Sequence, residues 1–449
     1  MKRAVLASVI GVAIVAACSS SDDEQKITLT GEALRDPNNC LPCHQDQFRE
    51  WSGSMHAYAS EDPVFRAMNK RMIRETNGAS KDLCVGCHAP VALRLGLTTD
   101  GQNLSDLPTS VQGVTCYFCH SVDSVGETHV NNPLHLATDN ALRGGITNPV
   151  KSMPHKGIYS TLHDRENHDS ATLCGACHDV VTPHGAHVER TFEEWKSSLY
   201  SQPNQLACGK CHMDGREGKA AQTASDAPTR KVHDHSMAAV DIALTPFFGA
   251  DAQKELVQRF LDNSILTQLC VQRQPTGVIM AVTLDNAFAG HGFPSGAAQD
   301  RRVWVELHAF KDGAEFFKTG AVGDKQAASA YADPNYWLLR DTIFDDANKE
   351  THLFWQAART ESEQLPPAVT SDPTDPRFIH SKTRNIQLAQ MPDRVTMRVR
   401  MRPLDYDLLD DLVASGDLDP KVRDAAPVFD MASGTKEWTP EKAISNCVK

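Results

Sequence analysis

The sequence predicts two domains of different fold class: a mainly helical and loop domain over residues 36–240, followed by an all-β, sandwich-like domain over residues 274–449. The first prediction depends on five Cys-x-x-Cys-His strings, which all lie at or before residue 212 in a segment with few long apolar runs. The second depends on alternating apolar and polar residues in the C-terminal part, the pattern of half-buried strands. A helix within residues 241–273 is expected to connect the two domains.

The five strings are the strongest chemical signal in the chain. Their cysteines are Cys40, Cys43, Cys84, Cys87, Cys116, Cys119, Cys174, Cys177, Cys208 and Cys211, and their histidines are His44, His88, His120, His178 and His212. Two cysteines three positions apart can bond the two vinyl groups on one edge of a haem, and the next histidine then lies under the iron as its proximal ligand. Zinc sites and disulfides also use cysteine pairs, but neither needs a histidine after every pair. The sequence therefore predicts five covalently bound c-type haems, stacked closely together.

A second axial histidine on each haem would use five more of the 19 histidines. The candidates lie near the strings or in a loop that could reach back to them: His56, His135, His155, His184, His187, His235 and His291. On one continuous helix, His56 would lie about 18 Å beyond His44, too far to close over the same iron. We therefore expect His56 to bind a different haem. For each candidate the alternative is an ordinary surface or loop histidine.

The pattern Trp-x-x-Ser-x-His after the first string recurs after the fourth, with tyrosine in the last position. The two copies are Trp51, Ser54 and His56, and Trp195, Ser198 and Tyr200. One interpretation is a decayed repeat whose tryptophan and serine still pack against haem. The other is that one haem has lost a ligand and become open to substrate, with Tyr200 marking the place.

The segments between the strings contain few regular elements. Residues 93–145 are rich in Gly, Asn, Thr and Asp and are expected to be mostly loop. Residues 189–199 are expected to form a helix between the fourth and fifth strings. Most of this domain therefore depends on the haems for its core.

The C-terminal part changes character after a predicted amphipathic helix over residues 250–269. The predicted strands include residues 278–284, 302–310 and 395–401. Lys311-Asp312-Gly313 is a hairpin turn signal. Cys270 and Cys447 lie outside the strings and could form a disulfide in an oxidising compartment, or remain separate thiols.

The N-terminus predicts export. Lys2 and Arg3 precede an apolar run over residues 4–17, which is too short to span a bilayer and is typical of a secretory signal. Small residues before Cys18 resemble a lipoprotein cleavage site, and residues 18–35 would form a polar tether for an acyl chain on Cys18. An ordinary signal peptide is the alternative. The outer membrane is the expected location, facing either the periplasm or the cell surface.

The net charge is −12, which gives no reason to expect a nucleic-acid partner. An acidic surface is compatible with a basic redox partner, such as another cytochrome or a quinol-linked donor. The membrane is the other expected partner, through the lipid anchor.

Several motifs resemble a known family. They are the tryptophan pattern that ends at His56, Gly113-Val114-Thr115-Cys116, Cys174-Gly175-Ala176-Cys177-His178-Asp179, Thr191-Phe192-Glu193-Glu194-Trp195 and Cys211-His212-Met213. Together they resemble the multihaem family that includes the tetrahaem cytochromes of nitrification, which is similar in haem packing to hydroxylamine oxidoreductase and pentahaem nitrite reductase. The resemblance covers residues 39–237, and His291-x-Phe293-Pro294-x-Gly296 is similar to a further motif. It implies stacked haems with mostly bis-histidine ligation and electron transfer.

Three functions are consistent with these patterns. The first is electron transfer along closely packed haems between periplasmic or outer-membrane partners. The second is an oxidoreductase with one five-coordinate haem that acts on a small nitrogen or sulfur compound. The third is a subunit of a polymeric surface cytochrome. Pentahaem nitrite reductases carry lysine in place of one proximal histidine, and no Cys-x-x-Cys-Lys string occurs here, which argues against that enzyme.

Overall fold

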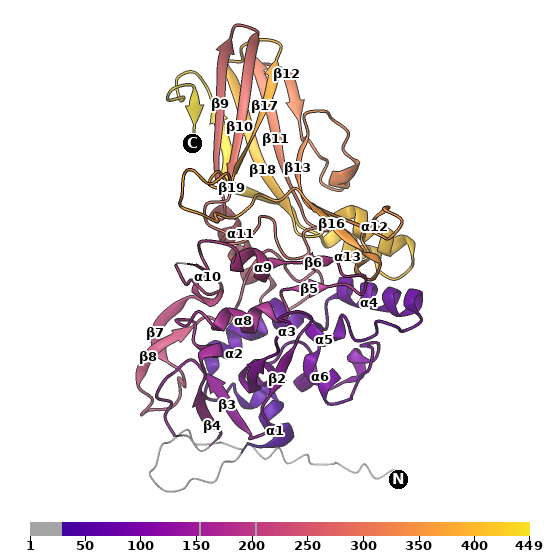
Figure 1. The fold of residues 1–449 in the computed structure, drawn as a ribbon, viewed down its shortest axis with the longest axis vertical. Coiled ribbons are helices and arrows are strands. Elements are labelled where there is room, and N and C mark those ends of the chain that lie inside the picture. The colour runs from indigo at the N-terminus through magenta and orange to yellow at the C-terminus, as the bar shows by residue number, and fades with distance from the viewer. Residues whose placement is uncertain (1–28, 152–153, 203) are drawn as a thin grey trace, which may run out of the picture.

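The structure is a computed structural model that describes residues 29–151, 154–202 and 204–449. The predicted signal peptide and Cys18 lie outside the described residues. Figure 1 shows two parts along the long axis: an N-terminal part of short helices and small sheets, and a C-terminal part dominated by long strands. Within the described residues, no helix combines the length and hydropathy needed to cross a membrane.

Short helices dominate the N-terminal part. They are α1 (Gly31–Arg35), α2 (Gln45–Ser52), α3 (Met55–Tyr58), α4 (Pro63–Thr76), α5 (Val85–His88), α6 (Pro90–Arg94), α7 (Cys116–Ser121), α8 (Ser170–Gly175), α9 (Thr191–Lys196) and α10 (Gly209–His212). The longest, α4, begins where the Asp62 side chain accepts a hydrogen bond from the Val64 amide, and it ends at Asn77 in a left-handed conformation.

The N-terminal part also contains four two-stranded sheets that the sequence did not predict. They are β1 (Val122–Val125) with β2 (Leu134–Leu136), β3 (Ala141–Gly144) with β4 (Lys156–Tyr159), β5 (Val180–Val181) with β6 (His187–Glu189), and β7 (Gly215–Lys219) with β8 (Thr229–His233). The expectation that residues 93–145 are mostly loop is therefore only partly right. Strands this short carry too little alternation to be recognised from sequence.

Two antiparallel sheets form the C-terminal part. One has the order β17 (Ser381–Leu388), β10 (Gly277–Asp285), β9 (Leu266–Gln274), β20 (Cys447–Val448); the other has the order β12 (Ala314–Thr319), β11 (Arg302–Lys311), β18 (Arg394–Arg402), β19 (Phe429–Trp438), with β13 (Trp337–Leu339) also on β11. Their buried side chains form one core, which includes Leu269 and Met280 from the first sheet and Val305 and Val399 from the second. The prediction of a β-rich C-terminal part is confirmed.

The predicted end of the connecting helix, residue 269, lies too far along the chain. Helix α11 (Ala250–Asp262) ends before the predicted residue 269, and β9 begins at Leu266 because its residues pair with β10 over its whole length. A third sheet of β15 (Glu350–Thr351), β14 (Asp341–Phe344) and β16 (Arg359–Ser362) lies near the N-terminal part.

Two helices that the sequence left unassigned join the two parts of the molecule. They are α12 (Tyr406–Ala414) and α13 (Pro420–Ala425). Leu408, Leu409 and Leu412 of α12 share a buried cluster with Val64 and Ala67 of α4. Ion pairs flank this cluster, including one of 2.5 Å between Arg71 and Asp411. The β-rich part therefore packs directly on the domain that carries the strings.

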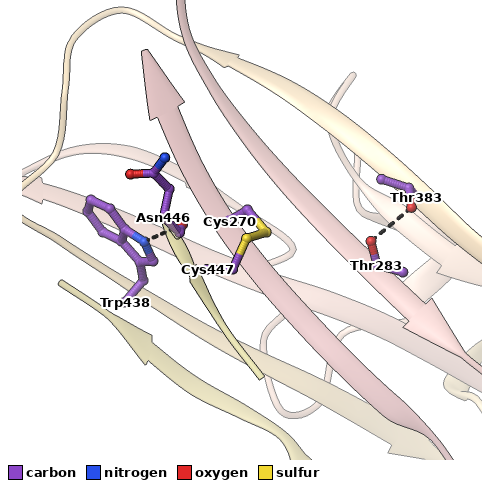
Figure 2. Close-up of a disulfide and its surroundings, with 6 residues drawn as sticks. All are labelled: Cys270, Thr283, Thr383, Trp438, Asn446 and Cys447. Carbon is purple, nitrogen blue, oxygen red and sulfur yellow. Dashed lines mark hydrogen bonds between the residues drawn. A yellow bond between two sulfur atoms is a disulfide. The ribbon is translucent and has the colours of Figure 1, made fainter. Parts of the chain in front are cut away.

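Cys270 and Cys447 form a disulfide across the paired strands β9 and β20, as Figure 2 shows. Trp438 donates from Nε1 to the carbonyl oxygen of Asn446 at 2.8 Å, on the chain segment that leads into β20. The disulfide thus holds the C-terminus on the sheet, which was one of the two alternatives that the sequence left open.

Candidate haem sites

A continuous cavity with a volume of 1380 Å³ runs through the N-terminal part. Every cysteine and histidine of the five strings lines it, so the strings meet in one space although they are spread along the chain. The β-rich part also reaches the cavity, through the loop that carries His291 and through Leu404 and Leu408.

Each string makes one helical turn, which places its histidine on the same side as its cysteines. The His44 amide donates to the Cys40 carbonyl at 2.9 Å, and the corresponding distance from His212 to Cys208 is 3.0 Å. Such a turn is local in origin, because it needs only a bond between residues four apart. All five strings therefore present the arrangement that covalent haem attachment requires.

The cysteines of different strings lie against one another. The thiol of Cys40 lies close enough to that of Cys116 to interact with it, and the same holds for Cys87 with Cys177 and for Cys174 with Cys208. Cys119 interacts electrostatically with Cys174. These contacts order the strings along the cavity as first, third, fourth and fifth, with the second string beside the fourth.

Each proximal histidine has its Nδ1 atom occupied, which leaves Nε2 for a metal. The acceptors are the carbonyl oxygen of Ala220 for His44 (2.7 Å), of Ala59 for His88 (3.0 Å), of Arg143 for His120 (2.5 Å) and of Ala238 for His212 (2.9 Å), and the carboxylate of Glu189 for His178 (3.1 Å). A histidine that binds a metal usually donates its other ring nitrogen in this way, because the bond fixes the tautomer and the ring orientation.

Four proximal rings face a second imidazole across the cavity. His120 also has His163 at 5.7 Å, but the Nε2 atom of His163 is bonded to the Cys119 carbonyl oxygen at 2.7 Å. The separations between ring centres are 6.1 Å for His44 and His155, 6.2 Å for His178 and His56, 6.3 Å for His120 and His235, and 6.4 Å for His212 and His291. A histidine nitrogen lies about 2.0 Å from a bound metal and about 1.1 Å from the centre of its own ring, so two imidazoles on one iron have their centres about 6.2 Å apart. The four pairs therefore fit an iron between them.

The opposite histidines are also prepared for ligation. His235 bonds through Nδ1 to the carbonyl of His233 at 2.9 Å, and His291 to that of Gly292 at 2.8 Å. Burial lowers the pKa of His56, His155 and His235 to about 4, so each is neutral near pH 7, the form that binds a metal.

His88 is the exception. Among the described residues, no imidazole lies opposite it at this separation. The Phe65 ring instead stacks on the face of the His88 ring, with centres 4.2 Å apart and planes within 2° of parallel. A metal binds a ring nitrogen in the plane of the imidazole, so the stacked phenyl ring of Phe65 offers it no ligand. The second string therefore offers one axial ligand where the other four offer two.

Comparisons with known proteins support a multihaem c-type cytochrome fold. The profile of the family described as cytochrome c554 and c-prime matches residues 39–121, which contain the first three strings. The solved penta-haem cytochrome c552 from Thermochromatium tepidum is similar with a TM-score of 0.61 and 18% identity, over 90% of this chain and 99% of that chain. The chain has the fold of a multihaem c-type cytochrome. No curated protein sequence matches it significantly. The likeness to hydroxylamine oxidoreductase and nitrite reductase stays a prediction.

Three sequence candidates for second ligands lie away from the proximal rings. His184 pairs with Asp346 at 2.8 Å, and His187 pairs with Asp179 at 3.3 Å. His135 is exposed on β2. Their nearness to a string in the sequence was the only reason to include them, and the chain turns them toward its surface instead.

The repeated tryptophan pattern is also a structural repeat. The indole nitrogens of Trp51 and Trp195 each donate at 2.8 Å to a carbonyl two residues before a string, that of Val114 and that of Leu206. The amides of the same two residues donate back to the carbonyls at the ends of the two copies, His56 at 2.9 Å and Tyr200 at 2.7 Å. The first copy therefore holds the third string and the second copy holds the fifth.

The last residues of the two copies, His56 and Tyr200, make different contacts. His56 faces His178, whereas Tyr200 donates its hydroxyl to the Ala287 carbonyl at 2.6 Å, on the loop that leads to His291. Glu194 holds the same loop by accepting bonds from the Gly292 amide and the Ser295 hydroxyl. The fifth string thus gains its opposite imidazole from the β-rich part, and Tyr200 does not mark an open haem.

Proposed function

We propose that this chain is an electron-transfer protein that holds five covalently bound haems. The observation that carries the proposal is the set of four facing imidazole pairs, with ring centres 6.1 to 6.4 Å apart, in one cavity lined by all five strings. A bound haem supplies a one-electron couple between ferric and ferrous iron. The count of five is supported by the five strings and by the similar penta-haem cytochrome.

The proposed axial pairs are His44 with His155, His120 with His235, His178 with His56, and His212 with His291. The second string would hold its haem through His88 alone. His56 follows the first string but faces the histidine of the fourth, in agreement with the expectation that it binds a haem other than its own. Each pair therefore joins chain segments that are distant in sequence.

Contact between the strings supports electron transfer over several sites. The cysteines attach a haem by its edge, so neighbouring cysteines of different strings would bring the edges of their haems close together. Apolar side chains such as Phe65, Phe118 and Leu134 wall the cavity and limit the access of water. A series of close, dry sites is what rapid passage of single electrons requires.

Intact mass and a potentiometric titration test this function together. We expect a mass that corresponds to five haems, which survive acid-acetone extraction, and five one-electron transitions. A chain with five haems that does not exchange electrons with any small cytochrome or quinol analogue would contradict the proposal.

A second function is favoured by one observation, the lack of an imidazole opposite His88. A haem there would have an open position and could act on a small nitrogen or sulfur compound as the site of an oxidoreductase. Turnover of nitrite or hydroxylamine by the reduced protein, abolished when carbon monoxide occupies a single site, would support this function. Binding of carbon monoxide without any turnover would favour electron transfer alone.

We also propose that Cys18 carries a lipid that anchors the protein to the outer membrane. The support is the apolar run that ends at Cys18 and the polar residues that follow it. A Cys18→Ser chain is expected to be found in the soluble fraction, because a single acyl-bearing cysteine would be the only anchor that the sequence predicts. Unchanged sedimentation with membranes would refute the anchor. Redox partners are expected to present a basic surface to this acidic chain.

A further inference from the structure

One proximal histidine differs from the other four in the group that accepts its Nδ1 proton. Four donate to backbone carbonyl oxygens: His44, His88, His120 and His212. His178 instead lies 3.1 Å from the carboxylate oxygen Oε1 of Glu189. A carboxylate is an anionic acceptor, and its hydrogen bonds are about twice as strong as those of neutral acceptors.

A small hairpin places this carboxylate. Strand β5 begins two residues after His178 and pairs with β6, so that Val180 lies opposite Glu189. The hairpin returns the chain to the fourth string and leaves Glu189 at the cavity wall, with 21% of its side chain exposed. The contact thus follows from backbone pairing and is not a chance approach of two surface side chains.

No comparably strong hydrogen bond acts on the imidazole that faces His178, so the effect of the Glu189 carboxylate is not balanced from the other side. The opposite histidine, His56, has its Nδ1 atom 3.1 Å from the sulfur of Met237, and a thioether is a weak acceptor. Arg301 also interacts electrostatically with Glu189, but its guanidinium is held by Asp241 through two bonds of 2.8 and 2.9 Å.

We propose that Glu189 tunes the haem held by Cys174, Cys177 and His178 to a lower reduction potential than a backbone acceptor would give. The proposal rests on the proposed function, in which His178 is an axial ligand. An anionic acceptor draws the Nδ1 proton and makes the ligating nitrogen a stronger electron donor, which stabilises ferric over ferrous iron. One electron is gained on reduction, and no proton transfer is needed.

The position of the fourth string gives this tuning a consequence for the whole chain. Its cysteines contact the second and fifth strings, and Cys174 interacts with Cys119 of the third. A haem with a low reduction potential at this junction would pass electrons between neighbouring haems but would itself be mostly oxidised.

The test is a potentiometric titration of the whole protein carrying Glu189→Gln, which keeps the shape of the side chain and removes its charge. We expect one of the five transitions to move upward by about tenfold in its equilibrium constant, which is about 59 mV for one electron. Glu193→Gln is the matched control, because Glu193 is exposed on α9 and its change removes the same charge from the same region. All other transitions are expected to stay within about twofold of their original constants.

Two results would overturn the proposal. One is a largest shift in Glu189→Gln no greater than that in Glu193→Gln. The other is a Glu189→Gln chain with fewer than five haems, which would make Glu189 a requirement for haem attachment and not a tuning residue. A failure of the proposed function is distinguishable from these results, because it would already appear in the unaltered protein as a missing haem or a missing low-spin signal.

Discussion

Replacement of His291 by alanine tests whether the β-rich part completes a haem site. The ring centre of His291 lies 6.4 Å from that of His212, and the two rings are within 17° of parallel. Without this imidazole, the haem on the fifth string would keep its thioether bonds and its proximal ligand but lose its second ligand. We therefore expect five haems per chain as before, with one of them changed from low spin to high spin.

The variant is expected to fold, because the loop has other anchors. Phe293 and Leu365 exchange two backbone hydrogen bonds of 3.0 and 2.8 Å, and Gln364 donates to the Pro294 carbonyl at 2.6 Å. The lost imidazole contacts and the bond to Gly292 are expected to cost about 1 to 3 kcal/mol of stability.

Carbon monoxide binding to the reduced protein measures the change by stoichiometry. The unaltered chain is expected to bind one carbon monoxide, at the haem on His88, and His291→Ala is expected to bind two. His184→Ala is the matched control, because His184 pairs with Asp346 and faces no proximal ring in the described part of the chain. A stoichiometry that does not change in His291→Ala would refute the assignment of His291, and with it the role of the β-rich part in haem binding.

Three further variants follow from the same contacts. His56→Met should raise one potential and leave five haems, because a thioether ligand favours ferrous iron more than an imidazole does, and an unchanged set of potentials would show that His56 only packs. Tyr200→Phe removes the 2.6 Å bond to the Ala287 carbonyl and should weaken the hold on the loop by about 1.4 kcal/mol. Carbon monoxide should then displace His291 at a concentration about tenfold lower than in the unaltered protein. Equal concentrations in the two proteins would mean that the hydroxyl does not position the loop. Cys270→Ser should destabilise the β-rich part by about 3 to 5 kcal/mol in denaturant titrations, because the disulfide closes a long loop, whereas the haem spectrum should not change.

The proximal half of each haem site was readable from the sequence because it is local. One helical turn fixes two cysteines and a histidine, so the string alone determines their relation. That His56 serves another haem stays a prediction; its ring faces that of His178 of the fourth string. The helix assumed for it is broken, because α2 ends at Ser52 and α3 begins after a new cap at Ser54.

The second ligands were harder to predict because they depend on tertiary structure. His155 meets His44 and His291 meets His212 from distant parts of the chain, and no spacing rule connects them. For the candidates close to a string, nearness in sequence was the only guide, and it also selected His184 and His187, which the chain places at carboxylates near its surface. Glu189 had no sequence signature, since its role depends on the pairing of β5 with β6.

The β-rich part was predictable as a class but not in its connections. Alternation identified strands such as β11 and β18 because each has one face in a common core. The packing of α12 on α4 could not be predicted, because an apolar helix face does not specify its partner. The loop with His291 was recognisable as a motif, but its approach to the fifth string depends on Tyr200 and Glu194.

Electron paramagnetic resonance of the fully oxidised protein, quantified against its haem content, tests the central account most directly. Four facing imidazole pairs and one proximal histidine without a partner predict four low-spin ferric haems and one high-spin ferric haem per chain. Five low-spin signals would show that His88 gains a second strong ligand, and two or more high-spin signals would show that at least one of the four pairs does not share an iron.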